Sequence, residues 1–428
     1  MATINAGDTA WMLASTALVF VMTPGLALFY GGMVRTKSVL NMMMMSVITI
    51  GIVSVLWVIY GYEIAFGHES GSPWFGGFGI TNFSGAVNEL TNNGGLYPIP
   101  LLTFVSFQLM FAIITPALIS GAIADRAKFG AWALFVAIWV TLVYFPVAHW
   151  VFAFGNKVGD VVTGVGFLAS KGLEDFAGGT AVHINAGAAG LALALVLGKR
   201  YGWKRDPMRP HSLPLVMLGA GLLWFGWFGF NAGSALGANG VAGLALLNTQ
   251  VATGAAVLGW LAVEKFKNGH ATSLGAASGA VAGLVAITPG CAFVDPWAAA
   301  VIGLIAGALC ARAVSIKYLL GFDDSLDVVG VHLVGGIWGS LAIGLLGSSA
   351  VNAVGLDGLF FGGGTALLAK QAMGVGVVFA YSFIATLIIG FLIEKTVGFR
   401  VKEQVEIEGI DVAEHAEAAY ENSSRGAI

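Results

Sequence analysis

Two histidines, His183 and His332, stand in the middle of long apolar segments, where ionisable side chains are rare. An ionisable residue deep in a membrane segment is costly and usually functional. A neutral imidazole offers one hydrogen-bond donor and one acceptor, so two facing rings can bond one another and still present polar edges to a pore. The other interpretation is that each ring only bonds a neighbouring backbone carbonyl. No cysteine or carboxylate joins the pair at ligand spacing, so we expect no metal site, and nothing else in the pattern requires a cofactor.

A carboxylate and several aromatic rings accompany the histidines. Asp175 opens the segment that carries His183, where a carboxylate accepts backbone N–H bonds and complements the helix dipole. Its negative charge would also favour a cation nearby, and we expect both roles. Phe107 and Phe111 lie one turn apart in an earlier segment, and each aromatic face can attract a dehydrated cation by about 0.5–2 kcal/mol. Aromatic residues at helical spacing also pack without binding anything, and that alternative stays open.

The composition indicates that these residues belong to a lipid-embedded chain. Apolar residues make up 57% of the 428 residues and charged residues 10%, and the mean hydropathy is +0.85, whereas a soluble domain carries about 25% charged residues. The 62 glycines lie mostly inside apolar runs, which suits helices whose backbones approach closely in a membrane. A net charge of −3 argues against a nucleic-acid partner. Cys291 and Cys310 lie in apolar segments without CxxC spacing, so no disulfide framework is expected.

Eleven segments are long and apolar enough to cross a hydrocarbon core, which takes about 20 residues per helix. They cover residues 10–33, 38–65, 99–124, 128–154, 179–198, 213–235, 241–263, 272–291, 296–315, 329–349 and 368–394. We therefore predict an all-α polytopic membrane protein with eleven transmembrane helices. The chain divides into a membrane domain, residues 1–395, and a polar tail, residues 396–428. That tail is either solvated or a docking element for a soluble partner.

The distribution of Lys and Arg sets the expected orientation, because cytoplasmic loops carry an excess of both. Of the 20 Lys and Arg residues, only Lys157, Lys171 and Lys370 fall on one side of the predicted segments, and all the others fall on the opposite side. The loop of residues 68–98, on the poorer side, has no basic residue. The pattern predicts a multi-pass protein of the cytoplasmic (inner) membrane with its N-terminus outside and its C-terminus in the cytoplasm.

The two histidine segments also indicate an internal repeat. The run VHINAG around His183 corresponds to VHLVGG around His332, and FYGG in the first segment corresponds to FNAG in the sixth. Segments one to five would then repeat as six to ten, followed by a long eleventh helix. Because five is odd, the second copy enters from the opposite side, which gives the inverted repeat typical of transport proteins. A pseudo-two-fold axis would bring the two histidines face to face, so we favour a shared site.

Four motifs resemble the signatures of one transport family. DFAGGTAVHINAGAAG, GWFGFNAGS, PGLALFYGG and DVVGVH are similar to those of the Amt/Mep/Rh ammonium transporters, in order from about Trp11 to beyond Gly409. The resemblance implies a bacterial Amt-type transporter with eleven helices, which forms homotrimers with one pore in each subunit. It implies transport of ammonium or ammonia across the cytoplasmic membrane, and no enzymatic activity.

The resemblance also implies an outer vestibule and a gate. Phe107, Phe152 and Ser234 would line a vestibule that recruits ammonium. Phe111 and Phe230 would be stacked beneath it as the gate.

Below this gate, the resemblance implies a pore built on the histidines. His183 and His332 would be its paired histidines, Trp227 would pack against them, and Asp175 would hold the vestibule and stabilise the cation indirectly. Ammonium would lose its proton below the vestibule, pass the histidines as ammonia and regain a proton inside. Removing the proton converts a charge that is costly in a membrane into a small neutral solute.

Two residues depart from the family pattern. Phe152 stands where the family usually has tryptophan, and phenylalanine is a weaker cation–π partner that lacks the indole N–H. Recruitment is therefore expected to be weaker. Glu63 stands where the family usually has a small hydroxyl residue, near the outer end of the second segment. Its carboxylate could concentrate cations at the mouth, join a proton path, or simply reach water.

Three other functions remain open on the sequence. An ammonium sensor of the same fold would transport little and normally carries a cytoplasmic signalling domain, for which this tail is too short. A gas channel of the Rhesus branch would lack the aromatic and serine recruitment set. A membrane redox enzyme would use the two histidines as axial haem ligands, with the haem in an open cavity between them.

A basic loop follows the fifth segment and is expected on the cytoplasmic side. It contains Lys199, Arg200, Lys204, Arg205 and Arg209. Together with the polar tail, these residues suggest a cytoplasmic regulator. In the family that the chain resembles, this regulator is a PII-type signalling protein.

Overall fold

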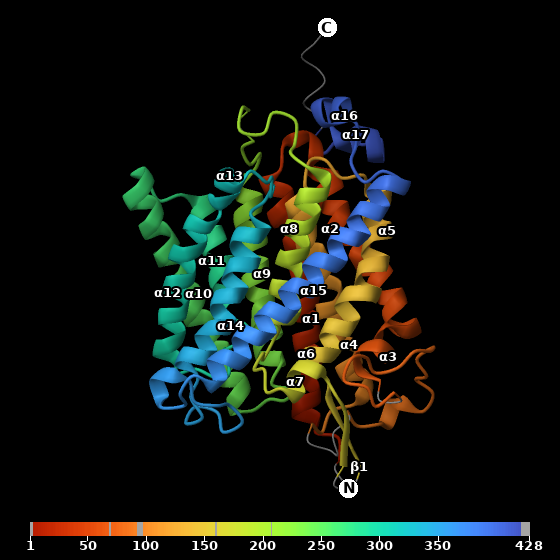
Figure 1. Cartoon of the computed structure of the whole chain (residues 1–428), viewed down its shortest axis with the longest axis vertical. Coiled ribbons are helices and arrows are strands. Elements are labelled where there is room, and N and C mark those ends of the chain that lie inside the picture. Colours follow the sequence, from red (N-terminus) through yellow and green to blue (C-terminus); the bar gives the residue numbers. More distant parts are fainter. Residues whose placement is uncertain (1–2, 68–69, 92–96, 159–160, 207, 421–428) are drawn as a thin grey trace.

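Helices make up most of the computed structural model, which describes residues 3–67, 70–91, 97–158, 161–206 and 208–420. They run through one bundle, with the N-terminal residues at its lower end and the last helices of the tail at its upper end (Figure 1). Residues 68–69 and 92–96 of the predicted outer loop and residues 421–428 of the predicted tail lie outside the described residues.

Eleven helical stretches of the described chain are apolar enough to cross a membrane, as the sequence predicts. Ten have 18 residues or more, and α11 is shorter at 15 residues. The stretches are α1 (Ala6–Met33); η1 (Thr36–Ser38), α2 (Val39–Leu56), η2 (Trp57–Gly61) and α3 (Tyr62–Phe66); α4 (Leu101–Ile119) with η4 (Ser120–Ile123); α5 (Phe129–Trp139), η5 (Val140–Tyr144) and α6 (Phe145–Phe152); η6 (Gly179–Ile184) with α8 (Asn185–Leu197); α9 (Leu213–Gly233); α10 (Gly240–Asn268); α11 (Ser273–Ile287); α12 (Pro296–Ala313) with α13 (Ile316–Leu320); η7 (Val329–Leu333) with α14 (Val334–Leu346); and α15 (Ala366–Thr396).

The remaining elements are short. They are η3 (Ala86–Asn88), β1 (Phe154–Val158), β2 (Val161–Val165), α7 (Phe167–Ser170), η8 (Leu359–Phe361), α16 (Glu403–Glu408) and α17 (Ile410–His415). The strands β1 and β2 form an antiparallel hairpin in which Phe154 lies opposite Val165. The sequence-based prediction did not include this hairpin, because five-residue strands carry little periodic signal beside long apolar helices.

The two histidine helices have the same local form. Each starts with a π-helical turn, η6 or η7, and continues as an α-helix of 13 residues, α8 or α14. Each histidine lies two residues before its α-helix begins. Arg200, just after α8, forms an ion pair with Asp323, which precedes η7. The end of one helix therefore lies beside the start of the other, so the two run in opposite directions, as the inverted repeat predicts.

Glycines allow several neighbouring helices to approach closely. A Cβ atom on Gly303 or Gly307 of α12 would lie 2.0 Å from a backbone oxygen of α10, that of Ala252 or Ala256 respectively. α1 and α9 meet in a similar way, since a Cβ on Gly219 would lie 2.3 Å from a backbone nitrogen of α1. The prediction that the glycines serve close helix packing is confirmed at these contacts.

The described part of the tail packs against the upper end of the bundle (Figure 1). Asp411 is buried and accepts hydrogen bonds from the backbone N–H groups of Leu40 and Asn41, at the start of α2. Glu406 is also buried and is paired with Arg400. The tail is therefore not wholly solvated: Glu406, Ile410 and Asp411 are buried, whereas neighbouring residues such as Ile407 and Val412 remain exposed.

Replacing Gly303 by alanine should destabilise the protein, because the added methyl group would meet the backbone of α10. Overpacking of this kind typically lowers the free energy of unfolding by about 1–3 kcal/mol. Gly254→Ala on α10 is the matched control, since no atom lies within 4 Å of the added Cβ, and removing a glycine from a helix interior is neutral or favourable. Thermal unfolding of the purified variants measures the difference. Equal melting temperatures would contradict the packing explanation.

Candidate functional site

His183 and His332 lie against one another in the interior of the bundle, where they are 1% and 3% exposed. Their Nδ1 atoms are 3.3 Å apart. Their ring planes differ by 21°, with centroids separated by 5.4 Å. Both are held in π-helical turns, which are rare and frequently occur at functional sites. The structure thus brings together the two residues that the repeat predicts as partners.

One shared proton joins the two rings. A hydrogen bond between two Nδ1 atoms requires one ring to donate and the other to accept. The donating neutral ring then has a bare Nε2, and the accepting one carries its proton on Nε2. Nε2 of His183 is buried and has no hydrogen-bond partner among the protein atoms of the described chain. Leaving a buried polar atom unpaired is unfavourable by about 1–3 kcal/mol, so this nitrogen suits a small polar solute.

The direct contact between the rings also bears on the haem alternative. With the two Nδ1 atoms at 3.3 Å, no haem fits between His183 and His332. The two residues cannot be the axial ligands of one iron in this arrangement. Within the described ranges, no group of three or more His, Cys, Asp or Glu side chains is arranged to hold a metal ion.

A column of aromatic rings leads to the histidine pair. Phe107 contacts Phe111 edge-on at 5.0 Å between centroids, and Phe111 stacks on Phe230 at 4.2 Å. Phe230 lies 6.1 Å from His183. These three phenylalanines are at most 1% exposed. The two predicted gate residues are therefore stacked on one another, with Phe107 on one side and His183 on the other.

Trp227 packs against His183, one of the two histidines that the resemblance implies as its partners. Its indole is stacked on His183 with centroids 5.3 Å apart and an angle of 18°. Its Nε1–H donates a hydrogen bond to the Thr288 hydroxyl at 2.8 Å, and that hydroxyl lies 3.2 Å from Oδ1 of Asn231. These contacts fix the plane of the indole. The sequence-based prediction missed Thr288, since it follows α11 and has no spacing relation to Trp227. Asn231 lies one turn after Trp227 on α9 and was quoted only as part of the motif GWFGFNAGS, without a role.

Asp175 caps the start of the helix that carries His183. Its carboxylate accepts hydrogen bonds from the backbone N–H groups of Gly178, Gly179, Thr180 and Ala181, and from the Thr180 hydroxyl. The predicted capping role is confirmed. Its negative charge lies at the positive end of the helix dipole, where it is stabilised.

Asp324 is the counterpart of Asp175 in the second repeat. It stands eight residues before His332, as Asp175 stands eight residues before His183. Its carboxylate accepts hydrogen bonds from the backbone N–H groups of Val328 and Val329 at 3.1 and 2.7 Å. Burial raises the pKa of Asp324 to about 6. We did not predict this residue, although the equal spacing to the two histidines could have identified it.

Ser234 and Phe152 are the remaining predicted recruitment residues. The Ser234 hydroxyl is half-buried and donates to the backbone oxygen of Phe230. Phe152 is 6% exposed and lies beside Gly178. No ring contact in the described chain joins Phe152 to Phe107.

Glu63 packs against the loop that follows α3. A Cβ added at Gly77 would lie 2.6 Å from its Oε1 atom, and one added at Gly67 would lie closer still. The side chain is half-buried. This position places the carboxylate against the segment that follows α3.

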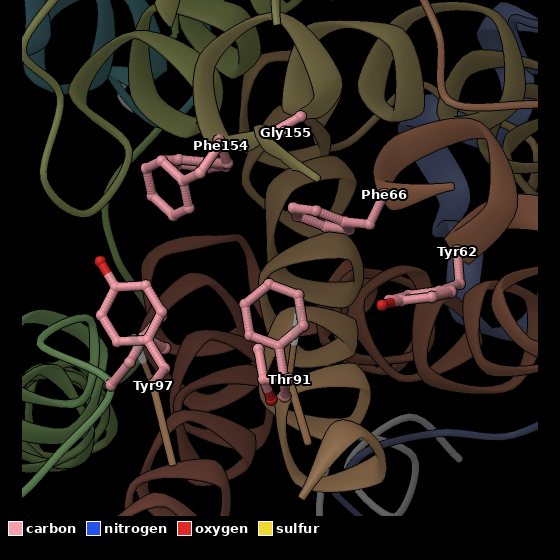
Figure 2. Close-up of a pocket in the computed structure, with 10 residues that line it drawn as sticks. Tyr62, Phe66, Thr91, Tyr97, Phe154 and Gly155 are labelled. Atoms are coloured by element: carbon pink, nitrogen blue, oxygen red, sulfur yellow. The ribbon is translucent and has the colours of Figure 1, made fainter. Parts of the chain in front are cut away.

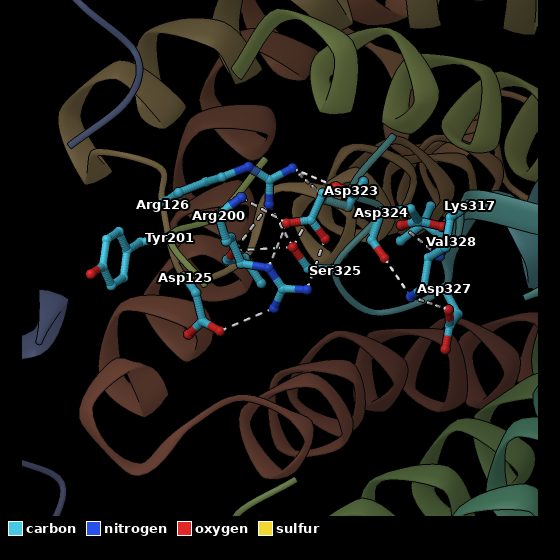
Figure 3. Close-up of polar contacts among 12 residues, drawn as sticks. Asp125, Arg126, Arg200, Tyr201, Lys317, Asp323, Asp324, Ser325, Asp327 and Val328 are labelled. Atoms are coloured by element: carbon cyan, nitrogen blue, oxygen red, sulfur yellow. Dashed lines mark hydrogen bonds and ion pairs between the residues drawn. The ribbon is translucent and has the colours of Figure 1, made fainter. Parts of the chain in front are cut away.

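An ion network joins three loops at the end of the bundle where α8 ends (Figure 3). Arg200 is 7% exposed and forms ion pairs with Asp323 at 2.9 Å and Asp125 at 3.2 Å. Burial opposes the charge on Arg200, but its bonds to Asp323 and Asp125 raise its pKa overall. Arg126 is fully buried and donates to the backbone oxygen of Asp323. Arg200 is therefore a structural residue, unavailable to a docking regulator.

Comparisons with known proteins identify the family of the chain. The chain matches the model of the Ammonium Transporter Family over residues 10–420. It is 57% identical to an ammonium transporter of Mycobacterium tuberculosis (strain H37Rv), over 97% of this chain and 91% of that protein. The structure is similar to that of Mep2 from Candida albicans, with a TM-score of 0.83 and 32% identity over 94% of this chain and 88% of that one.

A further solved structure, described as a sensor Amt protein, has a TM-score of 0.84 and 29% identity over 96% of this chain and 98% of that one. The family match spans every helix that carries the histidines and the aromatic column. The chain is a multi-pass membrane protein that belongs to the ammonium transporter family.

Proposed function

We propose that the protein moves ammonium across the cytoplasmic membrane by removing its proton, conducting ammonia past His183 and His332, and restoring a proton beyond them. The observation that carries this proposal is the buried histidine pair, bonded through Nδ1 at 3.3 Å, behind two stacked phenylalanine rings. The family membership supports ammonium as the substrate.

The surroundings of the pair favour a neutral solute over an ion. The path from Phe107 to His332 is lined by aromatic rings and imidazoles, and within the described chain no carboxylate forms a hydrogen bond with either imidazole. A bare cation in such surroundings carries a large desolvation penalty. Ammonia carries no charge, and it can exchange hydrogen bonds with the Nε2 edges of the imidazoles.

Recruitment would take place outside the gate. Phe107, Phe152 and Ser234 would offer two ring faces and a hydroxyl oxygen to ammonium, since aromatic faces attract partly dehydrated cations. Asp175 would contribute its charge at a distance, because its oxygens are already used in capping the helix. Glu63 would add a second negative charge at the same end of the bundle.

The assembly and orientation follow as further parts of the proposal. The excess of Lys and Arg on one side supports an N-terminus outside and a C-terminus in the cytoplasm. We propose a homotrimer with one pore in each subunit, and a PII-type partner at the face formed by the tail and the basic loop. The division into a membrane domain, residues 1–395, and a tail, residues 396–428, remains a prediction.

An ammonium sensor with little transport is the second candidate, and similarity to a sensor Amt protein favours it. The two functions differ in flux, because a sensor would bind ammonium without moving it at a useful rate. Transport is the better supported of the two, since the matching family model is that of ammonium transporters and a relative 57% identical is named an ammonium transporter.

Ammonium flux into proteoliposomes tests the proposed function. An ammonium gradient should change the internal pH faster with the wild-type protein than in protein-free liposomes. His183→Leu should slow this flux by roughly tenfold, because it removes the polar edge that receives the solute. His270→Leu, at an exposed histidine outside the bundle core, is the control and should match wild type. No acceleration by wild type would favour the sensor.

Restoring tryptophan at Phe152 should improve recruitment. An indole face attracts a cation more strongly than a phenyl face, so Phe152→Trp should lower the half-saturating ammonium concentration by up to about fivefold. The maximal rate should not change, because the gate and the histidines are untouched. Phe360→Trp, at an exposed ring, controls for adding an indole elsewhere. An unchanged or higher half-saturation would mean that this position does not limit recruitment.

A further inference from the structure

A small cavity surrounded by aromatic rings lies outside the gate (Figure 2). The elements α3 and β1, which contribute rings to it, lie at the lower end of the bundle in Figure 1. The volume of the cavity is about 30 Å³. Six rings line it, and we call them the aromatic cage: Tyr62, Phe66, Tyr97, Phe104, Phe152 and Phe154. The cage shares Phe152 with the recruitment set described above, whereas Phe107 and Ser234 do not line it.

Two groups of rings form opposite walls of this cavity. On one wall, Phe66 contacts Tyr62 at 5.8 Å and Phe104 at 5.1 Å between centroids. On the other wall, Tyr97 contacts Phe154 at 6.3 Å. No ring contact in the described chain crosses from one wall to the other, and Figure 2 shows the labelled rings arranged around the space between them.

Separate elements hold the two walls apart. Tyr62 and Phe66 belong to α3 and are 9% and 5% exposed, and Phe104 belongs to the first turn of α4. Phe154 begins β1, whose pairing with β2 fixes its backbone. The space is therefore set by helices on one side and a hairpin on the other.

The size and chemistry of the cavity suit one small cation. About 10–15 Å³ is enough to hold a water molecule, and ammonium is close to water in size, so the volume admits a single such ion. No charged side chain lines the cavity within the described residues. Ring faces supply the favourable electrostatics, since they attract cations that have shed part of their hydration.

The cage is continuous with the column of rings that leads to the histidines. Phe104 stands three residues before Phe107 on α4, so the two side chains lie on one face of that helix. We propose that the aromatic cage is a holding site for one ammonium ion, outside Phe107, from which the ion passes to the gate. This inference rests on the proposed transport function and adds a second cation site to it.

Paired substitutions at two cage positions test the proposal. Tyr97→Leu and Phe154→Leu remove a ring face, whereas Tyr97→Phe and Phe154→Tyr keep it at the same positions. Phe154 is 49% exposed, so its variants should fold even if those at Tyr97 do not. Phe78→Leu, at a 72% exposed ring outside the cage, is the control. Ammonium uptake into proteoliposomes is measured for each variant. The heat of binding is measured by titrating purified protein with ammonium chloride, and a titration with sodium chloride serves as the reference.

The ring-removing variants should raise the half-saturating ammonium concentration by about two- to fivefold and reduce the binding heat, with an unchanged maximal rate. The ring-preserving variants and Phe78→Leu should match wild type. The proposed holding site would be overturned if the ring-removing variants kept the half-saturating concentration and the binding heat of wild type. It would also be overturned if, at one position, the ring-removing and the ring-preserving change had equal effects. If wild type moves no ammonium, the transport proposal fails, and the binding heats alone then support or overturn the cage.

Discussion

The hydrogen bond between His183 and His332 is the contact on which the rest of this structure depends. It joins two helices that enter the bundle from opposite ends, so both must deliver an imidazole to the same depth. The matched π-helical turns and the matched 13-residue helices meet that requirement. Asp175 and Asp324, each eight residues before its histidine, fix the start of each helix by accepting its free backbone N–H groups.

The packing around this contact limits what the path can accept. Trp227 holds His183 from one side through stacking, and Phe111 and Phe230 close the approach with stacked rings. Buried imidazoles and phenyl rings offer hydrogen bonds and polarisable surface but no fixed charge along the path. Such a lining penalises a bare ion and accepts a small neutral molecule. At the end of the bundle where α8 ends, by contrast, Arg200 and Asp323 place fixed charges that tie the loops together.

Much of this arrangement could be predicted from the sequence, because membrane helices carry a strong and simple signal. The eleven apolar stretches, the paired histidines and the cap at Asp175 are all recoverable from run length, repeat position and helix-start chemistry. The gate pair and Trp227 came from a family resemblance rather than from spacing, since Phe111 and Phe230 are far apart in the chain and have no periodic relation.

The features that were missed are those that depend on three-dimensional contacts. The hairpin β1–β2 is too short to stand out beside long helices, and the packing of Glu406 and Asp411 depends on loops distant in sequence. In the sequence, Arg200 is indistinguishable from the surface charges of a basic loop. In the structure it is buried and paired with Asp323. Asp324 is different, because the eight-residue spacing to His332 was present in the sequence and would have identified it.

We propose that the pore is selective because ammonium must lose its proton to pass the histidines, and potassium provides the most direct test. Potassium resembles ammonium in size but has no proton to lose. Flux of both ions into proteoliposomes under matched gradients should show ammonium-linked transport by wild type and no potassium flux above protein-free liposomes. The variant His183→Asp with His332→Glu puts acids on the path, where buried charge requires a compensating cation, so it should admit potassium or lose transport. Wild-type protein that passes potassium as readily as ammonium would contradict the account.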